Sequence, residues 1–97
     1  MTDGELQAIV DKVMASLPAG VTVPHPQVIE GPRNIPAVQR KAGVQSFRHG
    51  AVVCLPMLDL VYIFRASLER EFGADRARME QTIRRALVDV VAAGFRS

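Results

Sequence analysis

Three side chains in this sequence could act as bases, nucleophiles or metal ligands near neutral pH: His25, His49 and Cys54. His25 lies between two prolines, His49 precedes a glycine, and Cys54 sits in an apolar run. None of them has a carboxylate or a second such residue at the spacing of a zinc site or of a Cys/His pair. The sequence therefore predicts no metal site, no cofactor and no catalytic residue, and we expect the chain not to be an enzyme.

The acids and glycines give no enzymatic pattern either. Glu69 and Glu71 are two positions apart, so on a helix they point to different sides and cannot work as an acid and base pair. The glycines do not follow either phosphate-binding spacing. Cys54 is the single cysteine, so it cannot form an internal disulfide, and we expect it to behave as a small buried hydrophobe.

Cations are the more promising side chains, because their distribution along the chain is uneven. Residues 1–30 hold four acids and one base, a formal charge of −3, whereas residues 31–97 hold six acids and eleven bases, a formal charge of +5. Most of these bases are arginines, whose forked guanidinium suits phosphate or carboxylate, although a genome rich in arginine codons would give the same excess. The candidate contacts to phosphate or to an acidic partner are Arg33, Arg40, Lys41, Arg48, Arg84 and Arg85.

The segment RKAGV at residues 40–44 resembles the turn of a helix-turn-helix. Residues 35–42 could form the first helix of that motif, with Gly43 at the turn. The second helix would place His49 and Gly50 where an apolar anchor and a helix former belong, and glycine costs up to about 1 kcal/mol there. We therefore expect no helix-turn-helix, and nucleic-acid binding through the basic segment 33–48 and the C-terminal arginines remains the alternative function.

Residues 1–20 predict an amphipathic helix that begins at Thr2 or Asp3 and ends before Pro18. Its apolar side chains recur at spacings of three and four, which makes one continuous stripe. This stripe could dock on the rest of the chain, exchange with another copy, or bind a partner. The helix also resembles the N-terminal helices that target cargo to bacterial microcompartments. The candidate partner contacts are Leu6, Ile9, Val10, Val13 and Leu17.

Residues 21–34 contain several prolines and predict an extended linker or an edge strand. A short helix follows from residue 35 to about residue 41. Residues 44–48 and 51–55 then predict two antiparallel strands, joined by a two-residue loop at His49 and Gly50.

Pro56 decides how the chain continues. A single helix from His49 to Phe72 would carry this proline in its interior at a cost of about 3 kcal/mol, so we expect Pro56 to begin a helix that ends at Phe72. Gly73 supplies a turn, and Asp75 caps a last helix that ends at Gly94, with Phe95 folded back on it. These two helices predict a C-terminal helical hairpin.

The fold expected from these elements is α+β, with three main helices and a small antiparallel β-hairpin. The 97 residues suffice for one domain, of which residues 35–97 form the compact part. We find no signal peptide and no apolar run of membrane-spanning length, and expect a soluble, cytoplasmic protein without a membrane partner. The predicted function is a small non-enzymatic protein–protein interaction domain, an adaptor, subunit or regulator, that forms homo-oligomers or larger assemblies.

Overall fold

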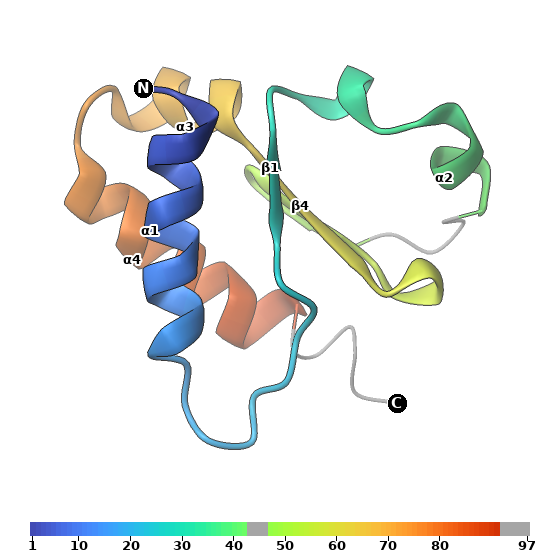
Figure 1. The fold of residues 1–97 in the computed structure, drawn as a ribbon, viewed down its shortest axis with the longest axis horizontal. Coiled ribbons are helices and arrows are strands. Elements are labelled where there is room, and N and C mark those ends of the chain that lie inside the picture. The colour runs from blue at the N-terminus through green and yellow to red at the C-terminus, as the bar shows by residue number, and fades with distance from the viewer. Residues whose placement is uncertain (43–46, 92–97) are drawn as a thin grey trace.

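The structure is a computed structural model that describes residues 1–42 and 47–91, and its fold is α+β as predicted. A four-stranded sheet has the strand order β1-β4-β3-β2. Three helices lie on one side of this sheet and the short helix α2 lies on the other (Figure 1). The strands are β1 (Gln27–Ile29), β2 (Phe47–His49), β3 (Val52–Leu55) and β4 (Leu60–Phe64). The α-helices are α1 (Asp3–Ala15), α2 (Ala37–Ala42), α3 (Arg65–Phe72) and α4 (Arg76–Ala86).

The predicted helix ends at capping residues are confirmed. Thr2 caps α1 through its side chain, and Glu5 returns a bond to the Thr2 backbone, which completes a capping box. Asp75 caps α4 by accepting a hydrogen bond from the backbone N–H of Arg78. Gly73 follows α3 with φ +60°, in the left-handed region that favours glycine. The predictions for Gly94 and Phe95 lie outside the described residues.

The predicted helix from Pro56 to Phe72 is wrong in its first half. Pro56 opens only a single 3₁₀ turn (η2, Pro56–Leu58), Asp59 takes φ +55°, and the chain then forms β4 before α3 begins at Arg65. The run LVYIF in β4 is covered on both faces of the sheet, so apolar residues do not alternate with polar ones along the strand. A short run of this kind cannot be distinguished from a buried helix by periodicity alone.

The predicted β-hairpin exists as β2 and β3, but it is one part of a larger mixed sheet. Its turn falls at Gly50 and Ala51, one residue later than predicted, with Gly50 at φ +57°. β1 is an edge strand that pairs in parallel with β4, which confirms the edge strand expected within residues 21–34. Strand β2 also occupies residues where a recognition helix would stand, so Phe47–His49 do not form the second helix of a helix-turn-helix; the expected turn at Gly43 lies outside the described residues.

The core lies between the sheet and the three helices α1, α3 and α4. Leu6 and Val10 of α1 are fully buried there beside Ile63 of β4 and Ile83 of α4. Helix α4 continues into a π-helical segment (η3, Leu87–Val91) that also packs near β2 and β3. Of the helices within the described ranges, none is both long enough and apolar enough to cross a bilayer.

Cys54 is fully buried in β3, as expected, and burial raises the pKa of its thiol to about 11. Because the thiolate is the reactive form, the native protein should react very slowly with an aromatic disulfide reagent at neutral pH. We expect one thiol per chain to react promptly in strong denaturant and almost none without it. Fast stoichiometric labelling of the native protein would contradict the burial of β3.

Candidate functional site

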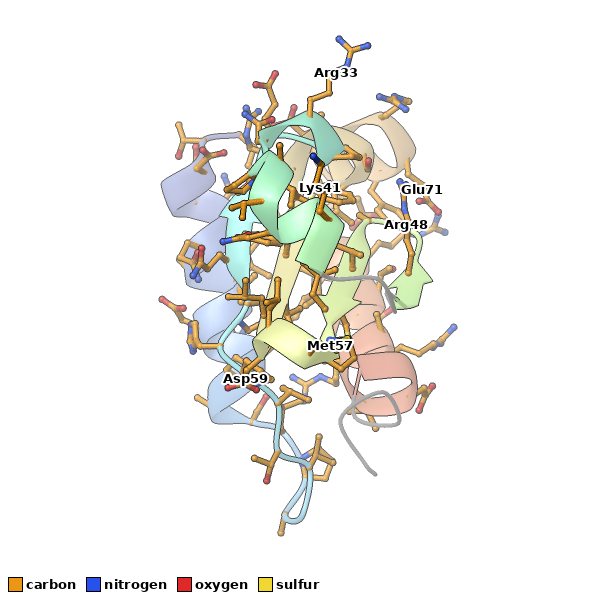
Figure 2. All side chains as sticks on the ribbon, turned by 90° about the vertical axis from the view of Figure 1, so that its right-hand side faces the viewer. Arg33, Lys41, Arg48, Met57, Asp59 and Glu71 are labelled. Carbon is orange, nitrogen blue, oxygen red and sulfur yellow. The ribbon has the colours of Figure 1, made fainter. Side chains whose placement is uncertain are left out.

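The structure separates the predicted cations into two groups. Arg33 in the 3₁₀ turn η1 (Pro32–Asn34), Lys41 in α2 and Arg48 in β2 are exposed and appear together on one side of the molecule (Figure 2). Arg84 and Arg85 belong to α4, which packs with α1 on the other side of the sheet. The side chain of Arg40, also predicted, lies outside the described residues.

The arginines of α3 and α4 are largely neutralised within the chain. Arg65 Nε lies 2.5 Å from Asp3 Oδ1, and its Nη1 lies 3.1 Å from Glu69 Oε1, contacts that raise the pKa of Arg65. Further ion pairs join α1 to α4, or lie within α4: Arg76 with Glu5, Lys12 with Glu80, and Arg84 with Glu80. Each exposed pair contributes little stability. Together they leave Arg65, Arg76 and Arg84 little unbalanced charge to offer to another molecule, whereas Arg70 and Arg85 are exposed and have no carboxylate within ion-pair distance among the described residues.

The Glu5 carboxylate shows how this neutralisation works. A hydrogen bond from the Thr2 backbone, and then the Arg76 guanidinium, hold the pKa of Glu5 below its usual range. Two acids of the N-terminal segment, Asp3 and Glu5, are thus matched by arginines that lie far away in the sequence, which offsets part of the charge difference between residues 1–30 and residues 31–97.

Arg33, Lys41 and Arg48 have no carboxylate within ion-pair distance among residues 1–42 and 47–91. Arg48 is nevertheless held in place, because its guanidinium lies 5.2 Å from the centre of the Phe64 ring and its Nε donates to the Gly50 carbonyl at 2.9 Å. These cations therefore carry the positive charge that the fold leaves available on this side.

Two large apolar side chains lie on the same side of the sheet. Val38 in α2 is 73% exposed and Met57 in η2 is 67% exposed, and α2 and η2 contact each other. The sequence did not indicate that either residue would be exposed. We call the exposed set the α2 face; it comprises Arg33, Lys41, Arg48 and Met57, which Figure 2 labels, and Val38 of the same helix as Lys41.

A hydrogen bond from Tyr62 Oη to Gln39 Oε1, at 2.6 Å, ties helix α2 to the sheet. Tyr62 is 5% exposed, so this bond lies at the base of the α2 face. We expect Tyr62→Phe to lower the free energy of unfolding by about 0.5–1.5 kcal/mol in urea denaturation. Gln39→Ala measures the same bond, so the double variant should lose less than the sum of the two single variants. Additive losses would show that the bond is absent in solution.

The apolar stripe of α1 faces the protein's own core. Leu6, Val10 and Val13 are fully buried, and Ile9 and Leu17 are partly buried against the same core. The three buried side chains have no surface to present to a partner in this conformation. The stripe is needed inside because α1 is one of the helices that cover this face of the sheet.

The residues considered for chemistry are not assembled into a site in the described part of the chain. His25 Nε2 lies 2.6 Å from Asp11 Oδ1, and both side chains are more than half exposed. Together with a hydrogen bond from Gln7, this contact lowers the pKa of Asp11. No group of three potential metal ligands occurs among the described residues, and the side chain of His49 lies outside them.

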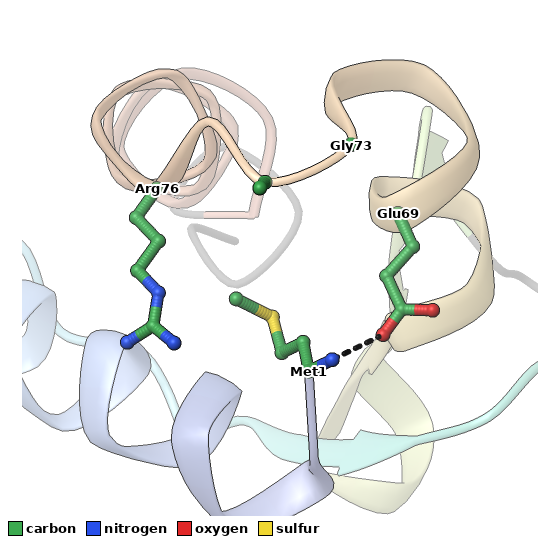
Figure 3. A pocket seen from close by; sticks show the side chains of 5 residues that line it. Met1, Glu69, Gly73 and Arg76 are labelled. Carbon is green, nitrogen blue, oxygen red and sulfur yellow. Dashed lines mark ion pairs between the residues drawn. The ribbon is translucent and has the colours of Figure 1, made fainter.

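A hollow of about 350 Å³ lies between the start of α1 and the turn that joins α3 to α4 (Figure 3). Its polar groups are already engaged, since the Met1 ammonium lies 3.6 Å from Glu69 Oε1 and Arg76 pairs with Glu5. It brings together no acid and base that could share a substrate.

Comparison of this chain with protein families, with curated proteins and with solved structures gives no match.

Proposed function

We propose that this chain is a non-enzymatic protein-interaction domain that binds an acidic protein through the α2 face. One observation carries the proposal: the exposed large apolar side chains Val38, in α2, and Met57, in the adjoining η2, belong to the same side of the sheet as three cations without an internal partner in the described chain, Arg33, Lys41 and Arg48. An apolar centre with a charged rim is the usual composition of a protein interface. The side of the protein that faces the viewer in Figure 2 measures 33 by 19 Å, which is enough for one side of a small interface.

The charge of the α2 face favours a partner other than a second copy. Its cations call for carboxylates, but in the described residues Asp3, Glu5 and Glu80 are already paired with this chain's own bases. A second copy could offer the carboxylates of Asp59 and Glu71, which have no ion-pair partner in the described chain and appear on this same side (Figure 2), so a homo-oligomer is a separate outcome of the test below. An acidic partner would also associate faster, because opposite charges steer the encounter.

Photo-crosslinking tests the proposal directly. Benzoylphenylalanine would replace Val38 or Met57 in the full chain, expressed in the cells that naturally make it, with Gln81 on α4 as the matched exposed control position. We expect one discrete protein adduct at positions 38 and 57 and none above background at position 81. Equal labelling at all three positions, or none, would contradict the proposal. An adduct the size of two chains would indicate a homo-oligomer instead.

Nucleic-acid binding is the second candidate, and the grouping of Arg33, Lys41 and Arg48 favours it. Against it, a continuous phosphate backbone along this side would pass the carboxylates of Asp59 and Glu71, whereas a protein partner can place its carboxylates beside the cations alone. A duplex of unrelated sequence separates the two functions by fluorescence anisotropy. Binding that weakens steeply with added salt would support a nucleic-acid role, and no binding at low ionic strength would remove it.

A further inference from the structure

The sheet has two edge strands, and one of them is closed by a side chain. Gln7 of α1 donates from Nε2 to the Pro26 carbonyl at 3.2 Å and accepts from the Val28 backbone N–H at its Oε1 at 3.3 Å. The Gln7 amide thus takes the place that a neighbouring strand would occupy beside β1. Just beyond β1, the Glu30 carbonyl accepts from the backbone N–H of Ala66. No additional strand can join the sheet at this edge without displacing α1.

The other edge is β2, where the register with β3 leaves the backbone N–H and carbonyl of one residue facing away from the sheet. His49 pairs with Val52 across the two-residue turn, so these residues form a hydrogen-bonded pair, and the next pair, Arg48 with Val53, is a non-hydrogen-bonded one. The backbone N–H and carbonyl of Arg48 consequently point away from β3. Within residues 1–42 and 47–91, neither group makes a hydrogen bond. Unbonded backbone groups of this kind on an edge strand are a template for an added strand.

The side chain of Arg48 indicates what that strand should carry. It lies over Phe64, on the sheet face that α2 covers, and it is exposed. A residue placed opposite Arg48 on a new strand would have its side chain on this same face. A second copy added about a twofold axis at Arg48 would set two guanidinium groups against each other, which is unfavourable, whereas a carboxylate at that position is favourable.

We infer that an extended acidic segment of the partner adds to the sheet beside β2, antiparallel to it, with a carboxylate opposite Arg48. This inference rests on the proposed function and specifies how its partner is held. Strand addition supplies backbone hydrogen bonds for affinity, and alternate side chains supply the specificity. The rest of the partner then lies over Met57 and helix α2 with Val38, since Met57 and Lys41 of α2 appear on the same side of the molecule as Arg48 (Figure 2).

A designed peptide makes the inference testable before the partner is identified. The probe is a capped peptide in which Glu and Val alternate over about ten residues, the upper end of strand length. The residue opposite Arg48 exchanges both backbone hydrogen bonds with it, so the amides of the Glu residues face β2. N-methylation of the Glu amides should weaken binding about tenfold or more, whereas N-methylation of the Val amides should leave it unchanged. The two peptides have the same charge and the same number of methyl groups.

The expected readout on the protein is amide hydrogen exchange, measured by NMR on the full chain. The Arg48 amide should exchange rapidly in the free chain and about tenfold or more slowly with the Glu/Val peptide. The variant Arg48→Glu should bind the corresponding Lys/Val peptide in preference. Arg48→Ala, which keeps the backbone edge, should lose the preference for acid while retaining the effect of N-methylation.

Four results would overturn strand addition at β2. They are no binding of the Glu/Val peptide, equal binding of the two methylated peptides, binding without protection of the Arg48 amide, and protection that rises with protein concentration in the absence of peptide. The last would show that a second copy pairs at this edge. If any of these results were obtained while the photo-crosslinked protein adduct at position 38 persisted, the proposed function would stand and only strand addition at β2 would be excluded.

Discussion

Replacing Leu6 with alanine should lower the free energy of unfolding by about 2–5 kcal/mol, because the side chain is fully buried and its removal leaves a cavity. This is a large fraction of the roughly 5–15 kcal/mol that stabilises a typical domain. Helix α1 contributes this side chain from the N-terminal segment that could equally have served a partner. Urea denaturation followed by circular dichroism measures the loss.

Lys12→Ala is the matched control on the same helix. Its ammonium lies 3.5 Å from Glu80 at an exposed position, so its loss should change the unfolding free energy by no more than about 0.5 kcal/mol. If Leu6→Ala were as harmless as Lys12→Ala, α1 would not belong to the core in solution. Val10→Ala gives a milder variant should Leu6→Ala fail to fold.

Phe64→Ala should cost about 3–5 kcal/mol, the largest effect expected of a single substitution in this chain. Phe64 is 1% exposed at the end of β4, and its ring also supports the Arg48 guanidinium at 5.2 Å. The loss therefore combines a cavity in the sheet with a cation–π contact. Equilibrium unfolding in urea, with the slope checked for a change in the denatured state, is the appropriate measurement.

Val38→Ala provides the comparison on the α2 face. Its side chain is mostly exposed, so we expect the unfolding free energy to stay within about 0.5 kcal/mol of the parent chain. A similar cost for both variants would show that α2 packs differently from the arrangement described. A negligible cost for Phe64→Ala would mean that β4 is not the central strand.

The sequence predicted those features that depend on local chemistry. Thr2 and Asp75 cap helices, and Gly73 and Gly50 adopt positive φ. A helix cap or a turn with positive φ depends on one residue and its immediate neighbours, so both can be recognised in the sequence. The hairpin of β2 and β3 was found for the same reason, although its turn was placed one residue too early.

Strand β4 could not be identified from local residues. A short apolar run can be a strand or part of a buried helix, and the choice depends on which elements cover its two faces. Tyr62 and Phe64 point to the side of α2, whereas Val61 and Ile63 point to α1 and α4. Only the completed fold shows that both faces are covered. The parallel pairing of β1 with β4 is likewise set by contacts between residues more than thirty positions apart.

The candidate surface was predicted only in part. The basic segment did contain Arg33, Lys41 and Arg48, but composition could not show that arginines such as Arg65 are neutralised by acids sixty residues away. Nor could periodicity show that Val38 remains exposed, since Ile35, an apolar residue three positions earlier and just before α2, is buried.

The most direct test of the α2 face as a contact surface is the yield of the protein adduct at position 38 in two charge-reversal variants. One carries Lys41→Glu and Arg48→Glu. The other carries Arg70→Glu and Arg85→Glu, which reverse two exposed cations of α3 and α4 and change the net charge equally. The first pair should reduce the yield about tenfold or more and the second should leave it unchanged. Equal reductions by both pairs would contradict a contact made specifically at the α2 face.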